Sequence, residues 1–261
     1  MLGVGGQSPS DALSDRVNVV AVQGANARHP DTVVAPVCQS CEVTLHATLF
    51  DMDGLLFDTE VLWLEAEVEI FGRLGVPIDE AKDRLTKGVY IDKVVADWRA
   101  LFPWEGPSNA EVVSMLIERV TELVTEKGRI MPGALRALDL ASERGPIALA
   151  SSTPLVLIHR ILHHFDLASR FASIHSAEFE TYAKPHPGVF LTAAASLNVA
   201  PERCLVFEDS AFGVLAAKSA LMAVVAVPTP LDSVLPTFAI ADLVLRSLEE
   251  LTPEWLDERF A

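Results

Sequence analysis

The sequence has few groups that could bind polyanions or cross-link a fold. Lysine and arginine together number 20, against 36 aspartates and glutamates, which gives a formal net charge of −16. A field of this sign repels nucleic acid and anionic membrane surfaces. Three cysteines in 261 residues are too few for a disulfide framework in a chain of this size. We therefore expect no nucleic-acid partner, no membrane partner and a reducing, cytoplasmic location.

Long apolar runs and a leader pattern are also missing. No run approaches the roughly 18 apolar residues of a membrane span, and no basic stretch followed by a hydrophobic one opens the chain. Residues 1–44 mix Gly, Ser, Pro, Asn and Asp with short Val and Ala runs, so we expect a disordered extension there. Its Cys38 and Cys41 have CxxC spacing, but no second ligand pair follows, which favours two plain thiols over a zinc site.

From residue 45 onward, short apolar runs alternate with helical segments. Half of all residues are hydrophobic, enough for a large buried core. Near-continuous apolar runs are typical of strands buried on both faces of a parallel sheet. Six strands are expected, at 45–50, 147–150, 172–175, 204–207, 222–227 and 243–245. This alternation predicts an α/β fold with a doubly wound parallel sheet.

One stretch, from about residue 61 to 129, breaks the alternation. It contains amphipathic helical segments such as 62–74 and 111–125 and no convincing strand. We therefore predict an α-helical cap domain at 61–129. The α/β catalytic core would then consist of residues 45–60 and 130–261.

Polar side chains follow the ends of several expected strands. They are Asp51, Asp53, Ser151, Lys184, Glu208 and Asp209. The carboxyl ends of parallel strands meet at one edge of a sheet, where ligands bind. Each residue alone has an ordinary explanation as a helix cap or a surface turn. Together, however, they make an oxygen cage suited to Mg²⁺ beside a cationic phosphate clamp.

Four motifs in this order make about residues 46–250 resemble a haloacid dehalogenase superfamily phosphatase, one with a helical cap inserted after the first motif. The motifs are Asp51-Met52-Asp53-Gly54, Ser151-Ser152-Thr153, Lys184-Pro185 and Glu208-Asp209. The resemblance implies an HAD-like Rossmannoid core. It also implies Mg²⁺-dependent hydrolysis of a phosphomonoester through an aspartyl-phosphate.

The resemblance assigns a role to each motif residue. Asp51 would attack phosphorus, and Asp53 would protonate the leaving group and then activate water. The phosphate-binding residues would be Gly54, Ser151, Ser152 and Lys184. The metal ligands would be Asp51, the Asp53 carbonyl, Asp209 and, directly or through water, Glu208.

The expected class of substrate comes from a similarity to a smaller group within this superfamily. Segments 96–99, 102–108 and 149–154 look similar to bacterial 2-deoxyglucose-6-phosphate and hexitol phosphatases, which implies a small sugar phosphate. Substrate contacts are expected from Lys87 and Tyr90, in a cap loop at 86–92, although Tyr90 stands where such relatives tend to have Arg. Glu60 is a further candidate, with a plain charge in the first turn of a helix as the alternative. Trp98 and Trp104 are expected in the core of the cap.

Other functions share parts of this pattern. A β-phosphoglucomutase has the four motifs, but such mutases have a His where Trp63 stands, which favours hydrolysis. A dehalogenase lacks the aspartate present here as Asp53, and a phosphonatase needs a cap lysine, for which Lys87 is the candidate. A non-catalytic sugar-phosphate-binding protein would be expected to lose one of the motif aspartates. We expect a monomer whose partner is its phosphomonoester substrate.

Two positions depart from the pattern of the family. Leu55 stands where many relatives have Thr. Leu221 stands where relatives commonly have a Gly that ends a helix in the left-handed conformation, so we expect the helix to end differently there. Asn198, in contrast, is expected to end the helix at 187–197 in the usual way.

Overall fold

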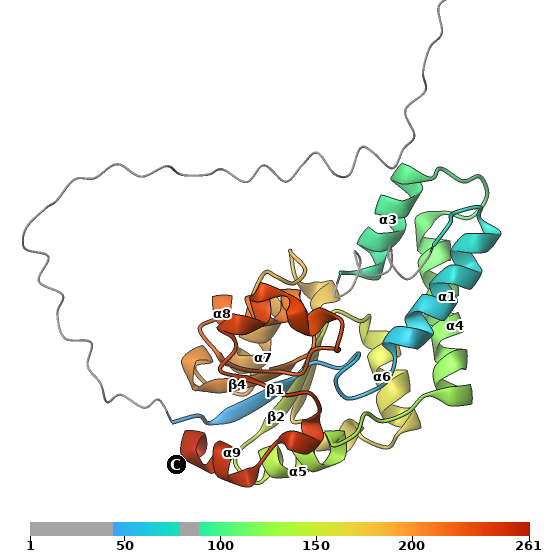
Figure 1. The fold of residues 1–261 in the computed structure, drawn as a ribbon. Coiled ribbons are helices and arrows are strands. Elements are labelled where there is room, and N and C mark those ends of the chain that lie inside the picture. Colours follow the sequence, from blue (N-terminus) through green and yellow to red (C-terminus); the bar gives the residue numbers. More distant parts are fainter. Residues whose placement is uncertain (1–43, 79–88) are drawn as a thin grey trace, which may run out of the picture. The chain divides into compact units, whose positions relative to one another are not determined.

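The computed structural model describes residues 44–78 and 89–261 (Figure 1). The strands within these ranges are β1 (Ala47–Phe50), β2 (Ile147–Ser151), β3 (Ser173–Ser176), β4 (Cys204–Glu208), β5 (Ala223–Ala226) and β6 (Leu243–Val244). They form one sheet in the order β3-β2-β1-β4-β5-β6, and all neighbouring strands are parallel. Each corresponds to one of the six expected strands, so the α/β fold class is confirmed.

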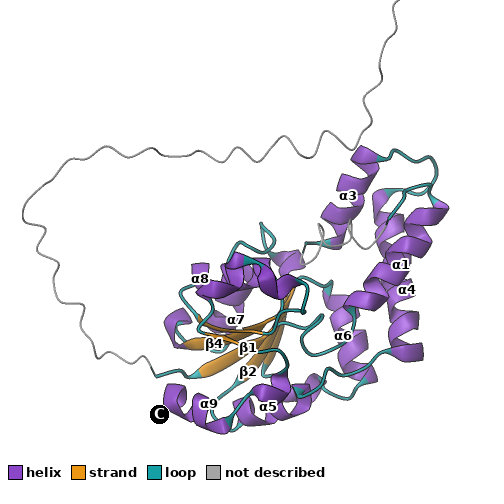
Figure 2. Cartoon of the chain, in the orientation of Figure 1, coloured by secondary structure: helices purple, strands orange, loops and turns teal. Residues whose placement is uncertain are grey.

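Helices cover both faces of this sheet (Figure 2). On one side are α5 (Ala134–Ser142), α6 (Leu155–His164) and α9 (Pro253–Phe260), and on the other are α7 (Gly188–Ser196) and α8 (Ala211–Ser219). Successive residues of β1 serve the two faces in turn, because side chains alternate along a strand. Phe50 packs in the apolar cluster that contains residues of α5, α6 and α9, and Leu49 packs in the cluster that contains residues of α7 and α8. Both faces are apolar, as expected for a doubly wound sheet.

Within the described ranges, three helices lie between β1 and α5 in the chain, and we call them together the helical insertion. They are α1 (Glu60–Arg73), α3 (Ile91–Leu101) and α4 (Asn109–Lys127). The helices expected at 62–74 and 111–125 are therefore present. The loop expected at 86–92 is corrected in part, because α3 already begins at Ile91, and residues 79–88 lie outside the described ranges.

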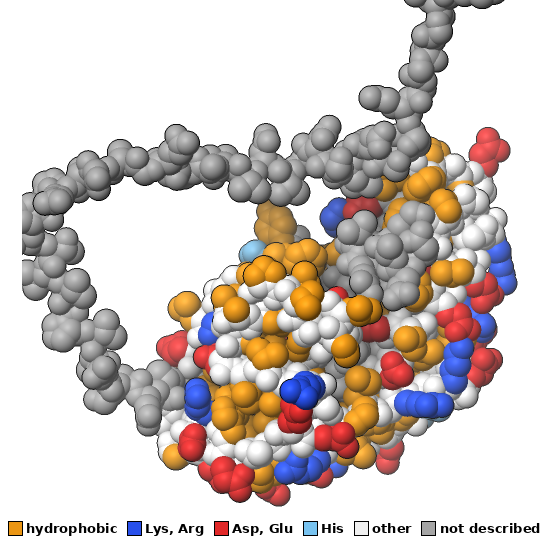
Figure 3. All heavy atoms as spheres, in the orientation of Figure 1, with side chains coloured by type: hydrophobic (Ala, Val, Ile, Leu, Met, Phe, Trp, Pro, Cys, Tyr) orange, Lys and Arg blue, Asp and Glu red, His pale blue; other side chains and the backbone are white. Residues whose placement is uncertain are grey.

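The insertion is held together by apolar packing inside and by ion pairs outside. Trp98 and Trp104 are buried, as expected. Arg119 on α4 pairs with Glu69 on α1 at 2.7 Å, and Lys127 pairs with Glu65. Figure 3 shows acidic and basic side chains interspersed over this part of the visible face. Exposed pairs of this kind contribute little each, so the buried face accounts for most of the stability.

The chain leaves the sheet for the insertion and returns along two segments that are hydrogen-bonded to each other. Phe57 and Ile130 form an antiparallel bridge. The Asp58 N–H donates to the Arg129 carbonyl, and the Met131 N–H donates to the Leu56 carbonyl, both at 2.9 Å. The crossing thus has local β structure. The exact division into a core and a cap at residues 60/61 and 129/130 stays a prediction.

Several composition-based expectations can be compared with the structure. Cys204 is a buried free thiol, as expected, and burial raises its pKa to about 12. Cys38, Cys41 and the extension predicted at 1–44 fall, apart from Thr44, outside the described ranges. Among the helices of residues 44–78 and 89–261, none has both the length and the apolar character needed to cross a membrane.

Among the described residues, three non-glycine residues have positive φ, and each follows a core helix; Asn198 and Leu221 are the two at helix ends considered from the sequence. Asn198 has φ 56° after α7, as expected. Leu221 has φ 63° after α8, and the Met222 N–H donates back to the Ala217 carbonyl at 3.1 Å. The expectation of a different helix end at Leu221 is therefore wrong, because this helix uses the left-handed end without a glycine. A leucine in that conformation costs about 1–2 kcal/mol, and the residue is 75% exposed, so packing offsets little of this.

We predict that Leu221→Gly stabilises the protein by about 0.5–1 kcal/mol, since relief of the backbone strain exceeds the entropy that glycine adds to the unfolded chain. Asn198→Gly is the matched control and should change stability less, because asparagine tolerates positive φ. Urea unfolding of both variants measures the difference. Equal effects of the two substitutions would contradict the strain at Leu221.

Candidate active site

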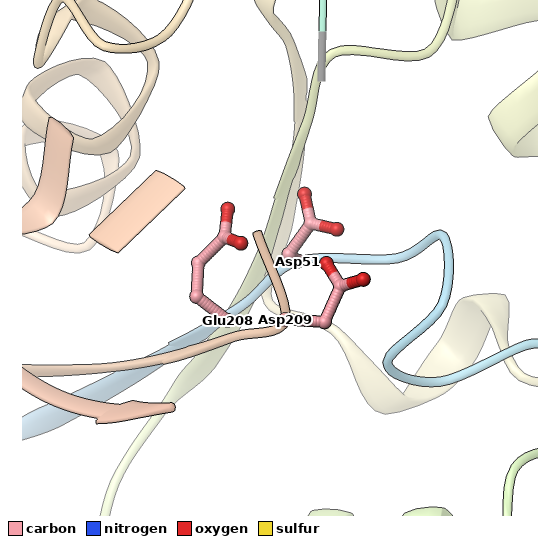
Figure 4. A group of neighbouring side chains, drawn as sticks. All are labelled: Asp51, Glu208 and Asp209. Carbon is pink, nitrogen blue, oxygen red and sulfur yellow. The ribbon is translucent and has the colours of Figure 1, made fainter. Parts of the chain in front are cut away.

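Three carboxylates converge where β1 and β4 end, which is also where the strand order reverses. Phe50 and Phe207 are paired across the two strands, and their rings stack with centroids 4.8 Å apart. The next residues along each strand, Asp51 and Glu208, therefore emerge side by side, followed by Asp209 (Figure 4). Oxygen atoms of the three carboxylates all lie within 4.8 Å of one another. Ligands of doubly wound sheets bind at this kind of position.

Lys184 places a positive charge among these carboxylates. Its Nζ donates to Asp51 Oδ1 and to Glu208 Oε1, both at 2.6 Å. The ammonium group also lies 4.8 Å from the centre of the Phe190 ring on α7. Lys184 is 4% exposed, so both ion pairs are buried. One ammonium group for three carboxylates leaves the cluster negative when all three are ionised.

The charges of this cluster depend strongly on burial. Burial raises the pKa of Asp51 well above its ordinary value, Lys184 opposes this shift, and Glu208 and Asp209 add to it. Burial disfavours the charged form of Lys184, but Asp51 and Glu208 outweigh this effect and raise its pKa. The three carboxylates offer hard oxygen ligands at a common point, which is the donor set that Mg²⁺ prefers. These residues therefore fit a divalent cation, which would favour ionised Asp51.

Glu208 has further partners besides Lys184. Its Oε2 accepts hydrogen bonds from the backbone N–H and from the hydroxyl of Ser210, both at 2.9 Å. Each of its oxygens thus accepts from a protein donor, which holds the carboxylate in place. Whether Glu208 ligates a metal directly or through water stays a prediction.

Asp53 lies in the loop after β1 and accepts hydrogen bonds from four side chains. On Oδ1 the donors are the Thr59 hydroxyl at 2.5 Å and the Trp63 indole N–H at 3.4 Å. On Oδ2 they are the Ser151 hydroxyl at 3.3 Å and the Thr153 hydroxyl. An indole N–H can only donate, whereas a hydroxyl can turn and accept. Oδ2 is therefore the oxygen that can carry a proton without losing its partners.

Three of these donors were not among the expected site residues. Thr153 lies in the Ser151-Ser152-Thr153 motif itself, so its hydroxyl was available as a signal. Thr59 precedes α1, and Trp63 lies one turn inside that helix. Their contacts with Asp53 depend on how the helix is placed against the sheet, which no local sequence pattern specifies.

Gly54 differs in part from what was expected. Its N–H donates to the Phe57 carbonyl at 2.9 Å, so this donor is used inside the loop rather than turned to a phosphate. A glycine is needed here for two other reasons. Its φ is 73°, and a Cβ would lie 2.5 Å from Asp209 Oδ2. The residue thus lets the loop approach the carboxylate cluster.

A pocket opens between these groups and the insertion. The residues that line it are Asp51, Asp53, Glu60, Trp63, Glu67, Val89, Ile91, Val94, Ser151, Ser152, Thr153, Pro154, Lys184, Asp209 and Ser210. The expected phosphate-binding residues Ser151, Ser152 and Lys184 are among them, and so is Glu60. Glu67 was not expected.

The other two expected substrate contacts are Tyr90, which does not line this pocket, and Lys87, which is not described. The Tyr90 hydroxyl donates to the Glu180 carbonyl at 3.2 Å, and Tyr90 is not one of the lining residues. Burial, followed by the charge of Glu180, raises the Tyr90 pKa, consistent with a neutral hydroxyl that donates. Lys87 lies outside the described residues. Substrate contact by either residue stays a prediction.

Known proteins are similar to this chain in sequence and in fold. A profile of haloacid dehalogenase-like hydrolases matches residues 45–220. Hexitol phosphatase B of Escherichia coli (strain K12) is 44% identical over 208 residues, which cover 79% of this chain and 94% of that protein. The structure of β-phosphoglucomutase from Clostridium difficile superposes with a TM-score of 0.72 at 25% identity, covering 83% of this chain and 97% of that one. CbbY from Rhodobacter sphaeroides, solved in complex with phosphate, gives a TM-score of 0.72 at 29% identity, covering 80% and 96%.

We predict that Mg²⁺ raises the melting temperature more at pH 7.5 than at pH 5.5. Because the pKa of Asp51 is raised in the folded state, the folded protein without a cation binds this proton more tightly than the unfolded chain does. That stabilisation is present at low pH and is lost as pH rises from the ordinary aspartate pKa of about 3.9 toward the raised value. Mg²⁺ competes with this proton for Asp51, so its binding and the stabilisation it gives should increase as the proton leaves.

At about 100 times its Kd, Mg²⁺ should raise the melting temperature by roughly 5–10 °C. Thermal denaturation with and without Mg²⁺ measures this without any substrate. Asp209→Asn should remove most of the increase, whereas Asp97→Asn, at an exposed ion pair with Lys93, should keep it. An increase that is the same at both pH values, or that survives in Asp209→Asn, would contradict a cation site at this cluster.

Proposed function

The chain belongs to the haloacid dehalogenase-like hydrolases, and on this premise we propose that it is a Mg²⁺-dependent phosphatase that acts on a small sugar phosphate. One observation carries the proposal. Asp51, bound to Lys184, faces the same pocket as Asp53 and Asp209. A nucleophile, a cationic phosphate clamp, an acid and a cation ligand are the four groups that such a reaction requires.

In the proposed first step, an oxygen of Asp51 attacks phosphorus. The bond between phosphorus and the leaving oxygen breaks, and Asp53 transfers a proton from Oδ2 to that oxygen. The products of this step are the free alcohol and an aspartyl-phosphate on Asp51. The indole N–H of Trp63, which donates to Oδ1, would keep the other oxygen of Asp53 in place.

In the proposed second step, Asp53 takes a proton from a water molecule as that water attacks the phosphorus of the aspartyl-phosphate. The bond to Asp51 breaks, inorganic phosphate leaves, and Asp53 again carries its proton. Ser151, Ser152 and Lys184 would hold the phosphoryl oxygens through both steps. The Mg²⁺ ligands would be Asp51, Asp209, the Asp53 carbonyl and, directly or through water, Glu208. When bound there, the cation would neutralise charge on the phosphoryl group.

The substrate class is supported by the similarity to hexitol phosphatase B and by the chemistry of the pocket. Glu60, Glu67 and Trp63 line it together with the expected phosphate-binding groups, and side chains of these types suit a hydroxyl-bearing leaving group. A mutase is less consistent with the sequence, because Trp63 stands where mutases of this family have His. We also propose a monomer that works in the cytoplasm, which the acidic charge and the few cysteines favour.

We predict that Asp51→Asn lowers Mg²⁺-dependent turnover of p-nitrophenyl phosphate and of a hexitol phosphate by at least roughly 10³-fold, because an amide cannot replace the nucleophile. Asp97→Asn should leave both rates unchanged. Release of inorganic phosphate, with and without a chelator, is the measurement. Unchanged turnover in Asp51→Asn would contradict the mechanism, and conversion of a hexose 1-phosphate to its 6-phosphate without phosphate release would indicate a mutase. Tight binding of sugar phosphates with no turnover would indicate a binding protein.

A further inference from the structure

Thr153 lies in the turn between β2 and α6 and contacts Asp53 through its side chain. Its hydroxyl donates to Asp53 Oδ2, and the residue lines the pocket although it is only 6% exposed. Threonine is branched at Cβ, so few χ1 rotamers are accessible to it. Once the backbone of Thr153 is fixed, the direction of its hydroxyl is therefore largely fixed as well.

The backbone of Thr153 is held by hydrogen bonds on both of its polar groups. Its N–H donates to the Ser151 hydroxyl at 3.1 Å, and its carbonyl accepts from the Ser176 hydroxyl at 2.6 Å. Ser176 is buried, is the last residue of β3 and is paired with Ser151 across the two strands. Hydrogen bonds thus run along the ends of three neighbouring strands, from β3 through the end of β2 to the loop after β1. They connect the carboxylate of Asp53 to the rigid sheet.

Ser151, the other donor to Asp53 Oδ2, is engaged differently. Its hydroxyl lies 3.3 Å from Oδ2, which is longer than the usual distance of about 2.7–2.8 Å between two such oxygens. In the proposed function, the same hydroxyl also holds a phosphoryl oxygen of the substrate. Thr153 is the closer of the two donors, and it is not one of the expected phosphate-binding residues. It can therefore stay on Oδ2 while Ser151 turns to the substrate.

The position of Oδ2 matters most when the leaving group needs a proton. An alkoxide is a poor leaving group, and a well-placed general acid accelerates its departure by about 10²- to 10⁴-fold. A protonated carboxyl oxygen keeps acceptor capacity, so Oδ2 can accept from Thr153 and donate to the leaving oxygen at the same time. A p-nitrophenolate ion, in contrast, is stable without a proton, so its departure depends little on where Oδ2 lies.

We infer that Thr153 is a positioning residue that holds Asp53 Oδ2 toward the leaving oxygen of the substrate. It acts through Asp53 and not through the phosphoryl group. The inference rests on the proposed phosphatase function and adds a residue to it. Its consequence is selective, because loss of the Thr153 hydroxyl should slow the hydrolysis of alkyl phosphates far more than that of aryl phosphates with a good leaving group.

The test compares Thr153→Val with Thr192→Val on two substrates. The Thr192 hydroxyl on α7 donates to Glu180 Oε1 at 2.7 Å, and Thr192 is exposed. It is thus a matched control, a threonine bound to a carboxylate outside the pocket. The substrates are a hexitol phosphate, which has an alkyl leaving group, and p-nitrophenyl phosphate. The values compared are kcat/KM, because in the proposed reaction they report the steps up to departure of the alcohol and not hydrolysis of the aspartyl-phosphate.

Thr153→Val should lower kcat/KM for the hexitol phosphate by about 30- to 100-fold, and for p-nitrophenyl phosphate by no more than about 3-fold. Thr153→Ser keeps a hydroxyl and should return the value for the hexitol phosphate to within about 5-fold of the wild type. Thr192→Val should leave both substrates unchanged. Thr153→Ala removes the hydroxyl without placing a methyl group against Asp53, so it replaces Thr153→Val if that variant does not fold. Thermal denaturation of each variant shows whether it is folded.

The outcomes separate this inference from the function on which it rests. An equal loss on both substrates would show a structural role for Thr153 and overturn the inference, as would no loss on the hexitol phosphate. A Thr153→Ser protein no more active than Thr153→Val would also overturn it, because the hydroxyl would then not be responsible. A wild-type protein without phosphatase activity would overturn the proposed function and the inference with it. An active wild type leaves the proposed function in place whatever the Thr153 variants do.

Discussion

The ammonium group of Lys184, held between Asp51 and Glu208, is the interaction on which the site depends. Carboxylates at the ends of β1 and β4 would repel each other in the interior without it, because buried like charges are poorly screened. The two strands bring these carboxylates together through the register that pairs Phe50 with Phe207. The stacked rings of Phe50 and Phe207 and the two ion pairs of Lys184 therefore support the same geometry. Removing the ammonium would leave two buried carboxylates without their shared partner, a loss of about 3–5 kcal/mol in comparable buried pairs.

Asp53 is placed by a different kind of interaction. Asp51 is fixed by a strand and a buried ion pair, but Asp53 lies in a loop and depends on hydroxyl and indole donors. Thr59 and Trp63 reach it from the start of the insertion, and Thr153 reaches it from the sheet. Its carboxylate is thus a point of contact between the two parts of the chain. In the proposed mechanism Asp53 gives up and regains a proton, and hydroxyl partners that can reverse their direction suit such a group.

The sequence predicts those features of this protein that depend on local pattern. Strands buried on both faces leave apolar runs, and Asp51 and Glu208 stand directly after such runs, so the sheet and the acidic cluster were both expected. Thr59 and Trp63 were not expected as donors to Asp53, because their contacts depend on the packing of α1 against the sheet. The conformation of Leu221 was not expected either, since the rest of the helix end holds a leucine where its own preference disfavours it. The conformational preference of a single residue has less influence on its structure where packing against neighbouring elements contributes a larger free energy.

The two crossings between the sheet and the insertion are bridged at Phe57 and Ile130, and Phe57 also accepts the hydrogen bond from Gly54 in the loop that contains Asp53. Backbone hydrogen bonds thus connect the insertion directly to the loop that contains Asp53. The outgoing and returning segments are therefore a short hydrogen-bonded pair and not two separate single-chain linkers. In the proposed function, the insertion that lines the pocket and the loop that carries the acid Asp53 would therefore be joined by backbone as well as by side chains.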